Sequence, residues 1–249
     1  MTDRIQFEAV QPVAALEPLV ESFWRLANET DDKKPAVILP DGRLDVSFTS
    51  RNHQRILLHG LETQPSQVEI APGFSMFCIS FRPLAAEYLF KSFLPIVPDS
   101  ISLLPANYFT DTVDHFENIG EFSGLLTEVL SKMLTADIDP RKKRLFDLIY
   151  SSHGGMSVRA LSENVGWSAR QMNRYFQDTF GMSLKTYCSV LRFRSSFGHI
   201  KSGKLFPKEN YADQSHFIRD IRKFAGVVPK ELAKNTNDRF IQFSTLPPS

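Results

Sequence analysis

Residues that typically begin or end a helix recur at short intervals throughout residues 141–249. Side chains that can cap a helix stand at Ser157, Ser168, Ser183 and Asp213. Glycines that can end a helix in the left-handed conformation follow at Gly154, Gly166, Gly181, Gly203 and Gly226. This spacing leaves room for short helices and predicts a compact all-helical domain. Its longest helix is expected from Ser183 to about His199.

The helix expected after Ser168 has two contrasting faces. Its apolar face comprises Met172, Tyr175, Phe176 and Phe180, and its polar face comprises Arg170, Asn173, Arg174 and Gln177. The polar residues are spaced i, i+3, i+4 and i+7, and such side chains can bind guanine or adenine edges in pairs of hydrogen bonds. With the preceding helix and Gly166, the pattern predicts a DNA-binding helix-turn-helix. The alternative is the solvated face of an ordinary helix pair.

Residues 213–229 repeat the same logic. Phe217, Ile221 and Phe224 are expected to face inward. The outward face is expected to carry Gln214, Ser215, Ile218, Arg219 and Arg222. Two such segments in one helical domain predict two helix-turn-helix units.

Over residues 141–233 the chain resembles the bacterial AraC/XylS family of transcription regulators. The motifs that carry the resemblance are Gly-Trp-Ser-Ala-Arg-Gln-Met-Asn-Arg-Tyr-Phe at 166–176 and Tyr-Ala-Asp-Gln-Ser-His-Phe at 211–217. The resemblance implies a seven-helix domain in which a long helix joins two helix-turn-helix units that enter successive major-groove segments. It implies DNA contacts by Arg170, Asn173 and Arg174 in the first unit and by Gln214, Ser215 and Arg219 in the second; Gln177 and Arg222 extend these faces.

The second unit departs from the family pattern. Residues 203–210 are too short for the family's supporting helix, Pro207 lies inside them, and Asn210 replaces the usual glycine. The second unit is therefore expected to be distorted, weakly specific or used mainly for backbone contact. Leu184 also stands where the family usually has proline, but a helix can start without that proline.

Residues 1–140 have the pattern of a β-rich domain. Short strands are expected at 37–39, 44–48, 56–58, 68–70 and 76–81, and a small sandwich or barrel is expected from them. Leu39-Pro-Asp-Gly42 and Pro72-Gly73 resemble the effector and dimerisation regions of the same family. The expected fold class is α+β, with an effector-sensing and dimerisation domain at 1–140 and a DNA-binding domain at 141–249.

The two halves carry opposite charge although the whole chain has a net charge of +1. Residues 1–140 hold 10 Lys and Arg against 20 Asp and Glu, which gives −10; residues 141–249 hold 19 against 8, which gives +11. Since phosphate contacts need cations, the basic half is expected to bind DNA and the acidic half to stay off it.

An amphipathic helix is expected at residues 116–134, with apolar residues from Phe122 to Leu134 at helical spacing. Two uses of its stripe stay open. It is a candidate homodimer contact, or it packs on the β-sheet of its own domain.

Other functional classes find little support. Cys78 and Cys188 are too few for a disulfide framework or a zinc site, and His53, His59 and His115 lack metal-ligand spacing. We expect no metal, no cofactor and no enzyme activity. No leader or membrane span is recognised, and a cytoplasmic bacterial protein without membrane attachment is expected.

The sequence thus predicts a one-component transcription regulator that binds double-stranded promoter DNA and responds to a small effector. RNA polymerase is a further candidate partner. The alternative is a ligand-binding or enzymatic amino-terminal module with a degenerate, weakly DNA-binding carboxyl-terminal adaptor. The sequence identifies no effector-binding residues.

Overall fold

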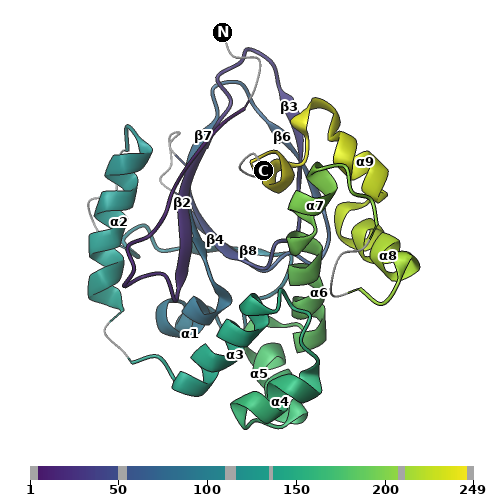
Figure 1. Cartoon of the computed structure of the whole chain (residues 1–249). Coiled ribbons are helices and arrows are strands. Elements are labelled where there is room, and N and C mark those ends of the chain that lie inside the picture. Colours follow the sequence, from purple (N-terminus) through teal and green to yellow (C-terminus); the bar gives the residue numbers. More distant parts are fainter. Residues whose placement is uncertain (1–4, 50–54, 110–115, 135–136, 207–210, 246–249) are drawn as a thin grey trace. The chain divides into compact units, whose positions relative to one another are not determined.

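The computed structural model describes residues 5–49, 55–109, 116–134, 137–206 and 211–245. The fold is α+β, with strands concentrated in the first part of the chain and helices in the rest (Figure 1). The chain divides into two compact units. The first unit comprises Met1–Lys34, Arg43–Gly60 and Ile70–Ile138, and the second comprises Pro35–Gly42, Leu61–Glu69 and Asp139–Ser249. Two short amino-terminal segments thus belong to the helical unit. The expected division of the chain at residue 140 did not include them.

The first unit is built on a six-stranded antiparallel sheet with the strand order β1-β2-β7-β4-β5-β8. The strands are β1 (Gln6–Val10), β2 (Val20–Ala27), β4 (Leu44–Thr49), β5 (Arg55–His59), β7 (Ser75–Phe81) and β8 (Ile101–Leu104). The expected strands at 44–48, 56–58 and 76–81 are confirmed. The expectation missed β1, β2 and β8. Most of β2 is buried on both faces, so its sequence lacks the alternation that marks a half-exposed strand.

One face of this sheet is apolar and aromatic. Phe23, Phe48 and Phe77 contact Phe122 of α2 (Ile119–Met133), with ring centroids 6.1, 5.3 and 5.2 Å apart. The helix begins at Asn118, whose side chain accepts a hydrogen bond from the Glu121 amide. The amphipathic stripe therefore packs on the sheet of its own unit, against β1 and β2. Dimerisation through residues 116–134 stays a prediction.

Two further strands form a separate sheet. β3 (Lys34–Ile38) pairs with β6 (Ser66–Ile70), close to the positions expected for them. After β7, a short 3-10 turn (Pro83–Ala85) leads into α1 (Ala86–Leu89), and a second such turn covers Lys91–Phe93. Most of β3 and β6 belongs to the second unit.

The second unit contains the helices that the sequence punctuation predicts. They are α3 (Pro140–Ser151), α4 (Val158–Val165), α5 (Ala169–Phe180), α6 (Leu184–Ser195), α7 (Phe197–Lys201), α8 (Gln214–Ala225), α9 (Pro229–Lys234) and α10 (Ile241–Ser244), with a 3-10 turn at Thr236–Asp238. The side chain of each of the four expected caps accepts a hydrogen bond from the backbone amide three residues later. Gly166, Gly181 and Gly226 end their helices with φ of 71°, 63° and 72°.

The expectation of one helix from Ser183 to about His199 is wrong. The helix is interrupted at Ser196, between α6 and α7. There both the amide and the hydroxyl of Ser196 donate to the Phe193 carbonyl, at 3.1 and 2.6 Å. Phe193 and Phe197 are both buried, and their rings meet edge to face at 4.8 Å. The break thus accompanies the packing of both rings into one core.

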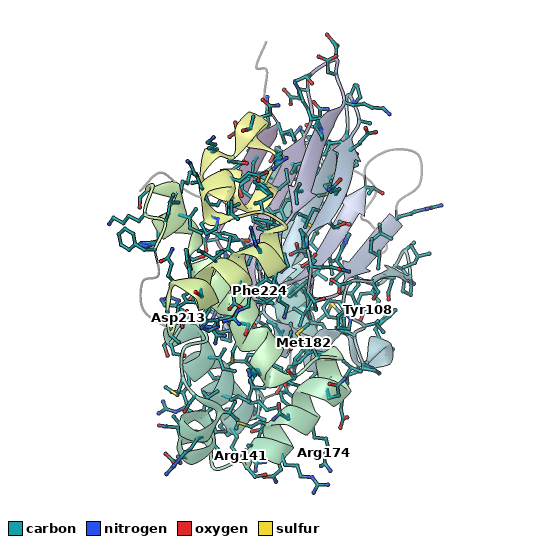
Figure 2. The ribbon with its side chains drawn as sticks, turned by 90° about the vertical axis from the view of Figure 1, so that its right-hand side faces the viewer. Tyr108, Arg141, Arg174, Met182, Asp213 and Phe224 are labelled. Atoms are coloured by element: carbon teal, nitrogen blue, oxygen red, sulfur yellow. The ribbon has the colours of Figure 1, made fainter. Side chains whose placement is uncertain are left out.

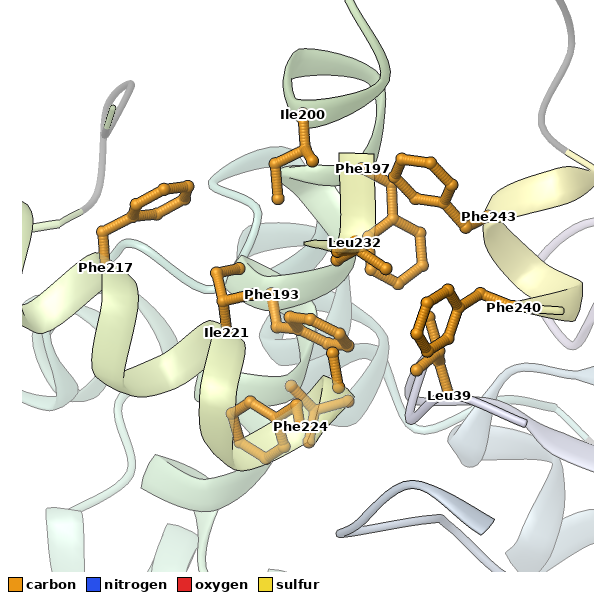
Figure 3. Packing of buried hydrophobic residues seen from close by; sticks show 12 residues of the cluster. Leu39, Phe193, Phe197, Ile200, Phe217, Ile221, Phe224, Leu232, Phe240 and Phe243 are labelled. Atoms are coloured by element: carbon orange, nitrogen blue, oxygen red, sulfur yellow. The ribbon is translucent and has the colours of Figure 1, made fainter. Parts of the chain in front are cut away.

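That core, which we call the aromatic cluster, is lined by residues from α6 to α10 and by one residue from the amino-terminal half (Figure 3). Its aromatic members are Phe193, Phe197, Phe217, Phe224, Phe240 and Phe243. Ile218, expected on the outward face of its helix, is instead partly buried against this cluster. Burial of large apolar side chains at this density is the main stabilisation of the second unit.

Within the described part of the chain, no helix is both long and apolar enough to cross a membrane. Cys78 and Cys188 are both buried and neither forms a disulfide, and burial raises the pKa of Cys188 to about 11. The Cys188 thiol is therefore protonated at neutral pH.

Candidate nucleic-acid interface

The first candidate interface is the helix, turn and helix from α4 to α5. α4 ends at Val165, the three residues 166–168 form the turn, and α5 begins at Ala169. Ser168 and Gln171 form a capping box, in which each side chain accepts from the other residue's backbone amide. Local sequence thus sets both the end of α4 and the direction in which α5 leaves the turn.

The back of α5 is locked into the second unit. Met172, Phe176 and Phe180 are completely buried. The ring of Phe146 from α3 lies 5.7 Å from Phe176 and 6.1 Å from Phe180. The predicted apolar face is confirmed, and it holds α5 rigidly enough to present its other face in one orientation.

The front of α5 carries Arg170, Asn173, Arg174 and Gln177, all exposed. At 100° per residue these four span about 100° of the helix surface, so they form a single stripe. Neither arginine has an ion-pair partner among the described residues, in contrast to Arg159 of α4, which pairs with Glu163 at 2.9 Å. Figure 2 shows the Arg174 side chain extending away from the ribbon. Within the described segments, no side-chain hydrogen bond or ion pair occupies the stripe, so it can meet an external acceptor.

Further cations lie against the aromatic residues of this helix pair. The Arg141 guanidinium is 5.5 Å from the Trp167 ring, and the Lys142 ammonium is 5.1 Å from the Tyr175 ring. Lys143 instead pairs with Asp147 at 2.7 Å. The start of α3 thus adds positive charge beside α4 and α5.

The second candidate face is on α8. Ser215, Arg219 and Arg222 are exposed on it, and Phe217, Ile221 and Phe224 are buried behind it. Gln214 is exposed too, but its amide donates to the Leu205 carbonyl at 3.0 Å. A base-reading role for Gln214 would need that hydrogen bond to break.

The described part of the segment before α8 does not form the supporting helix that a second helix-turn-helix needs. Residues 203–206 are not helical, and residues 207–210, including Pro207 and Asn210, lie outside the described residues. The second unit of the predicted pair therefore stays a prediction. The exposed basic face of α8 is an observation.

Arg192 of α6 connects the turn after α3 with α8, and the sequence expectations gave it no role. Its guanidinium donates to the Gly154 carbonyl at 2.9 Å and to the Ser189 hydroxyl at 2.7 Å, and lies 4.0 Å from Asp220 of α8. Gly154 ends the turn after α3, with φ of 70° and a Cβ position only 2.2 Å from the Cys188 carbonyl oxygen. α6 also contacts both α5 and α8.

His216 and Tyr211 complete the polar group around Asp220. The Nε2 atom of His216 is 3.5 Å from the Asp220 carboxylate, and its ring meets Tyr211 at 5.3 Å. Burial raises the pKa of the Tyr211 hydroxyl, and the nearby Asp220 carboxylate adds to the rise. These contacts place His216 in the support of α8 rather than on its exposed face.

The first unit has a polar sheet face opposite its aromatic one. The Trp24 indole donates to Ser80 at 2.8 Å, Ser80 donates to Asp45 at 2.6 Å, and Ser47 is 2.8 Å from the Nε2 atom of His59. Burial lowers the pKa of His59, which favours its neutral form. We call these five residues the polar sheet face.

The histidines considered for metal binding in this unit are only partly described. His53 and His115 lie outside the described residues, and His59 bonds to Ser47. Among the residues described, no three His, Cys, Asp or Glu side chains gather closely enough to hold a metal ion.

Comparisons with known proteins find one family model and several solved structures that resemble the chain. A family model described as a domain of unknown function, DUF6597, matches residues 8–96, and no curated protein matches. Among solved structures, ToxT from Vibrio cholerae is 14% identical, with a TM-score of 0.42 and coverage of 93% of this chain and 98% of that chain. ToxT bound to unsaturated fatty acid is 12% identical, with a TM-score of 0.39 and coverage of 94% and 97%. Since both TM-scores are below 0.5, we base no argument on this likeness.

Proposed function

We propose that this protein is a sequence-specific DNA-binding regulator of transcription. In this proposal α5 enters the major groove with Arg170, Asn173, Arg174 and Gln177, and α8 contributes Ser215, Arg219 and Arg222, with Gln214 where its bond to Leu205 opens. The first unit binds a small effector. The protein acts in the cytoplasm of a bacterium without catalysing a reaction of its own.

The observation that carries the proposal is the unpaired stripe on α5. On a solvated helix an exposed arginine can pair with a carboxylate one turn away, as Arg159 does with Glu163. Arg170 and Arg174 find none among the described residues, and Asn173 between them offers the paired donor and acceptor that adenine needs. The buried apolar face of α5 fixes the helix, and its exposed face carries hydrogen-bonding side chains that are unpaired within the described residues. Such a helix is better suited to the major groove of DNA than to a purely solvent-facing position.

The test starts from the full chain and a library of random-sequence duplexes. Repeated selection should enrich one sequence, which is then measured by fluorescence anisotropy against a scrambled duplex of equal composition. A Kd that does not distinguish the two duplexes at any salt concentration contradicts the proposal.

Substitutions on the stripe assign its role. Arg170→Ala should weaken binding of the selected duplex by about 1–3 kcal/mol and relax the preference at one base position. Arg159→Ala is the matched control, since Arg159 is exposed on α4 and already paired. If Arg170→Ala and Asn173→Ala together leave both Kd and base preference unchanged, the adaptor alternative replaces this one.

The effector part of the proposal rests on the polar sheet face. Hydrogen-bonding side chains on a sheet face can orient a small polar molecule, and Asp45 would favour one that donates hydrogen bonds. Asp45→Asn should abolish any thermal shift produced by such a compound in a ligand screen, whereas Asp99→Asn, elsewhere in the first unit, should not. A hit whose shift survives Asp45→Asn binds elsewhere.

A further inference from the structure

The segment Pro35–Gly42 comes from the amino-terminal half but is part of the helical second unit. Its strand residue Val37 forms an isolated parallel bridge with Phe240, and the Val37 amide donates to the Arg239 carbonyl at 2.6 Å. Two residues on, the Leu39 amide donates to the side-chain oxygen of Gln242 at 2.7 Å. The segment is thus bonded through its backbone to residues about 200 positions later.

The side chain of Leu39 is completely buried in the aromatic cluster. Figure 3 shows it directly beside the Phe240 ring. The cluster also contains Phe193 of α6 and Phe224 of α8. One leucine from outside the helical sequence therefore completes the core between these helices.

The turn that follows, Pro40-Asp41-Gly42, is buried, although turns normally lie in solvent. Its carbonyls face α6: the Tyr187 hydroxyl donates to Gly42 at 3.2 Å, and Arg194 donates to Asp41 at 3.4 Å. Gly42 has φ of 77°, and a Cβ there would lie 2.9 Å from the Leu191 Cδ2 atom. The backbone thus rests directly on α6, at a position where any side chain would collide with it.

We infer that Pro35–Gly42 is a docked segment that holds α6 and through which the first unit controls the DNA-reading helices. The control part rests on the proposed function; the docking does not. α6 contacts both α5 and α8, so a shift of α6 changes the relation of the two basic faces. Gly42 is followed after a single residue by β4, which pairs with β5 and β7 inside the sheet and carries Asp45 and Ser47. The covalent path from the polar sheet face to α6 is therefore three residues long.

Docking is tested by hydrogen exchange with mass spectrometry on full-length variants. Leu39→Ala empties a buried site, and Gly42→Ala places a methyl group against Leu191 in a strained conformation. Amide exchange in α6 and α8 should accelerate by about tenfold or more in both variants, while exchange in α2 stays unchanged. An acceleration confined to residues 34–60 overturns the docking.

Two matched controls and one mild variant guard the result. Leu103→Ala removes an exposed leucine of β8, and Gly124→Ala adds a methyl group in α2 where nothing lies within 4 Å; neither should alter exchange in α6. Where Leu39→Ala does not fold, Gln242→Leu decides, since it removes only the acceptor of the Leu39 amide. It should raise exchange at α6 and α10 by about threefold, and no rise overturns the docking.

Control is tested with the duplex selected above. Gly42→Ala should lower its affinity by about tenfold, whereas Arg170→Ala lowers affinity without changing exchange in α6. Wild-type affinity in Gly42→Ala overturns the control role. If the unsubstituted chain binds no DNA specifically, the proposed function fails, and the exchange data still decide whether the segment docks.

Discussion

At the scale of the residue, the buried histidine of the first unit makes stability depend on pH. Burial lowers the pKa of His59, while the unfolded chain keeps a value of about 6.5. As pH falls through about 6.5, the unfolded state binds a proton that the folded state does not. The free energy of unfolding should therefore fall by up to about 1.4 kcal/mol per pH unit until the folded-state pKa is reached.

The measurement uses urea unfolding in a Trp167→Phe background, so that fluorescence reports Trp24 and hence the first unit alone. His59→Gln keeps a partner for Ser47 and should remove the loss between pH 7.5 and pH 5. His153→Asn, at an exposed histidine of the second unit, should not. An unchanged pH profile in His59→Gln would assign the dependence to another group.

At the scale of the element, short local signals decided where the helices begin and end. Ser168 and Gln171 satisfy free amides at the start of α5, and Gly166 closes α4 without strain. These features need only neighbours in sequence, which is why the bounds of α4, α5 and α8 could be predicted. The break at Ser196 could not, because it serves the burial of Phe193 and Phe197 in a core formed by distant residues.

The cap of α5 gives a testable prediction at the scale of the element. Ser168→Ala should lower the free energy of unfolding of the second unit by about 1 kcal/mol, because it leaves the Gln171 amide without its acceptor. Urea unfolding followed by Trp167 fluorescence measures it. Ser195→Ala is the control, since this exposed serine only donates to the Arg192 carbonyl. Equal effects of the two substitutions would show that the capping box adds no stability.

At the scale of the whole molecule, the separation of charge predicts how binding responds to salt. Each phosphate contact that is lost should flatten the slope of log K against log salt by about 0.9. If Arg174 contacts a phosphate, Arg174→Ala should make the slope shallower. Asn173→Ala should change the base preference and leave the slope unchanged. Anisotropy titrations over several KCl concentrations measure both. Lys143→Ala, which removes a cation already paired with Asp147, should leave the slope unchanged.

The candidate site was partly predictable for the same reason as the helices. The stripe on α5 follows from helical spacing once the buried back is recognised, and the structure places all four residues in solvent. Gln214 on α8 shows the limit, because its bond to Leu205 depends on the path of the preceding turn. Arg192 shows it too, because its partners Gly154 and Asp220 lie far away in sequence.

The sequence by itself determined the bounds of α4, α5 and α8, the two-faced character of α5 and α8, and the opposite charges of the halves, because these depend on near neighbours and on composition. Only the tertiary structure decided to which unit Pro35–Gly42 belongs. As a sequence, Leu39-Pro-Asp-Gly42 predicts a surface turn between two strands. Its burial arises from Leu39 in the aromatic cluster and from Tyr187, Arg194 and Gln242, which are brought to it only when the helices have packed.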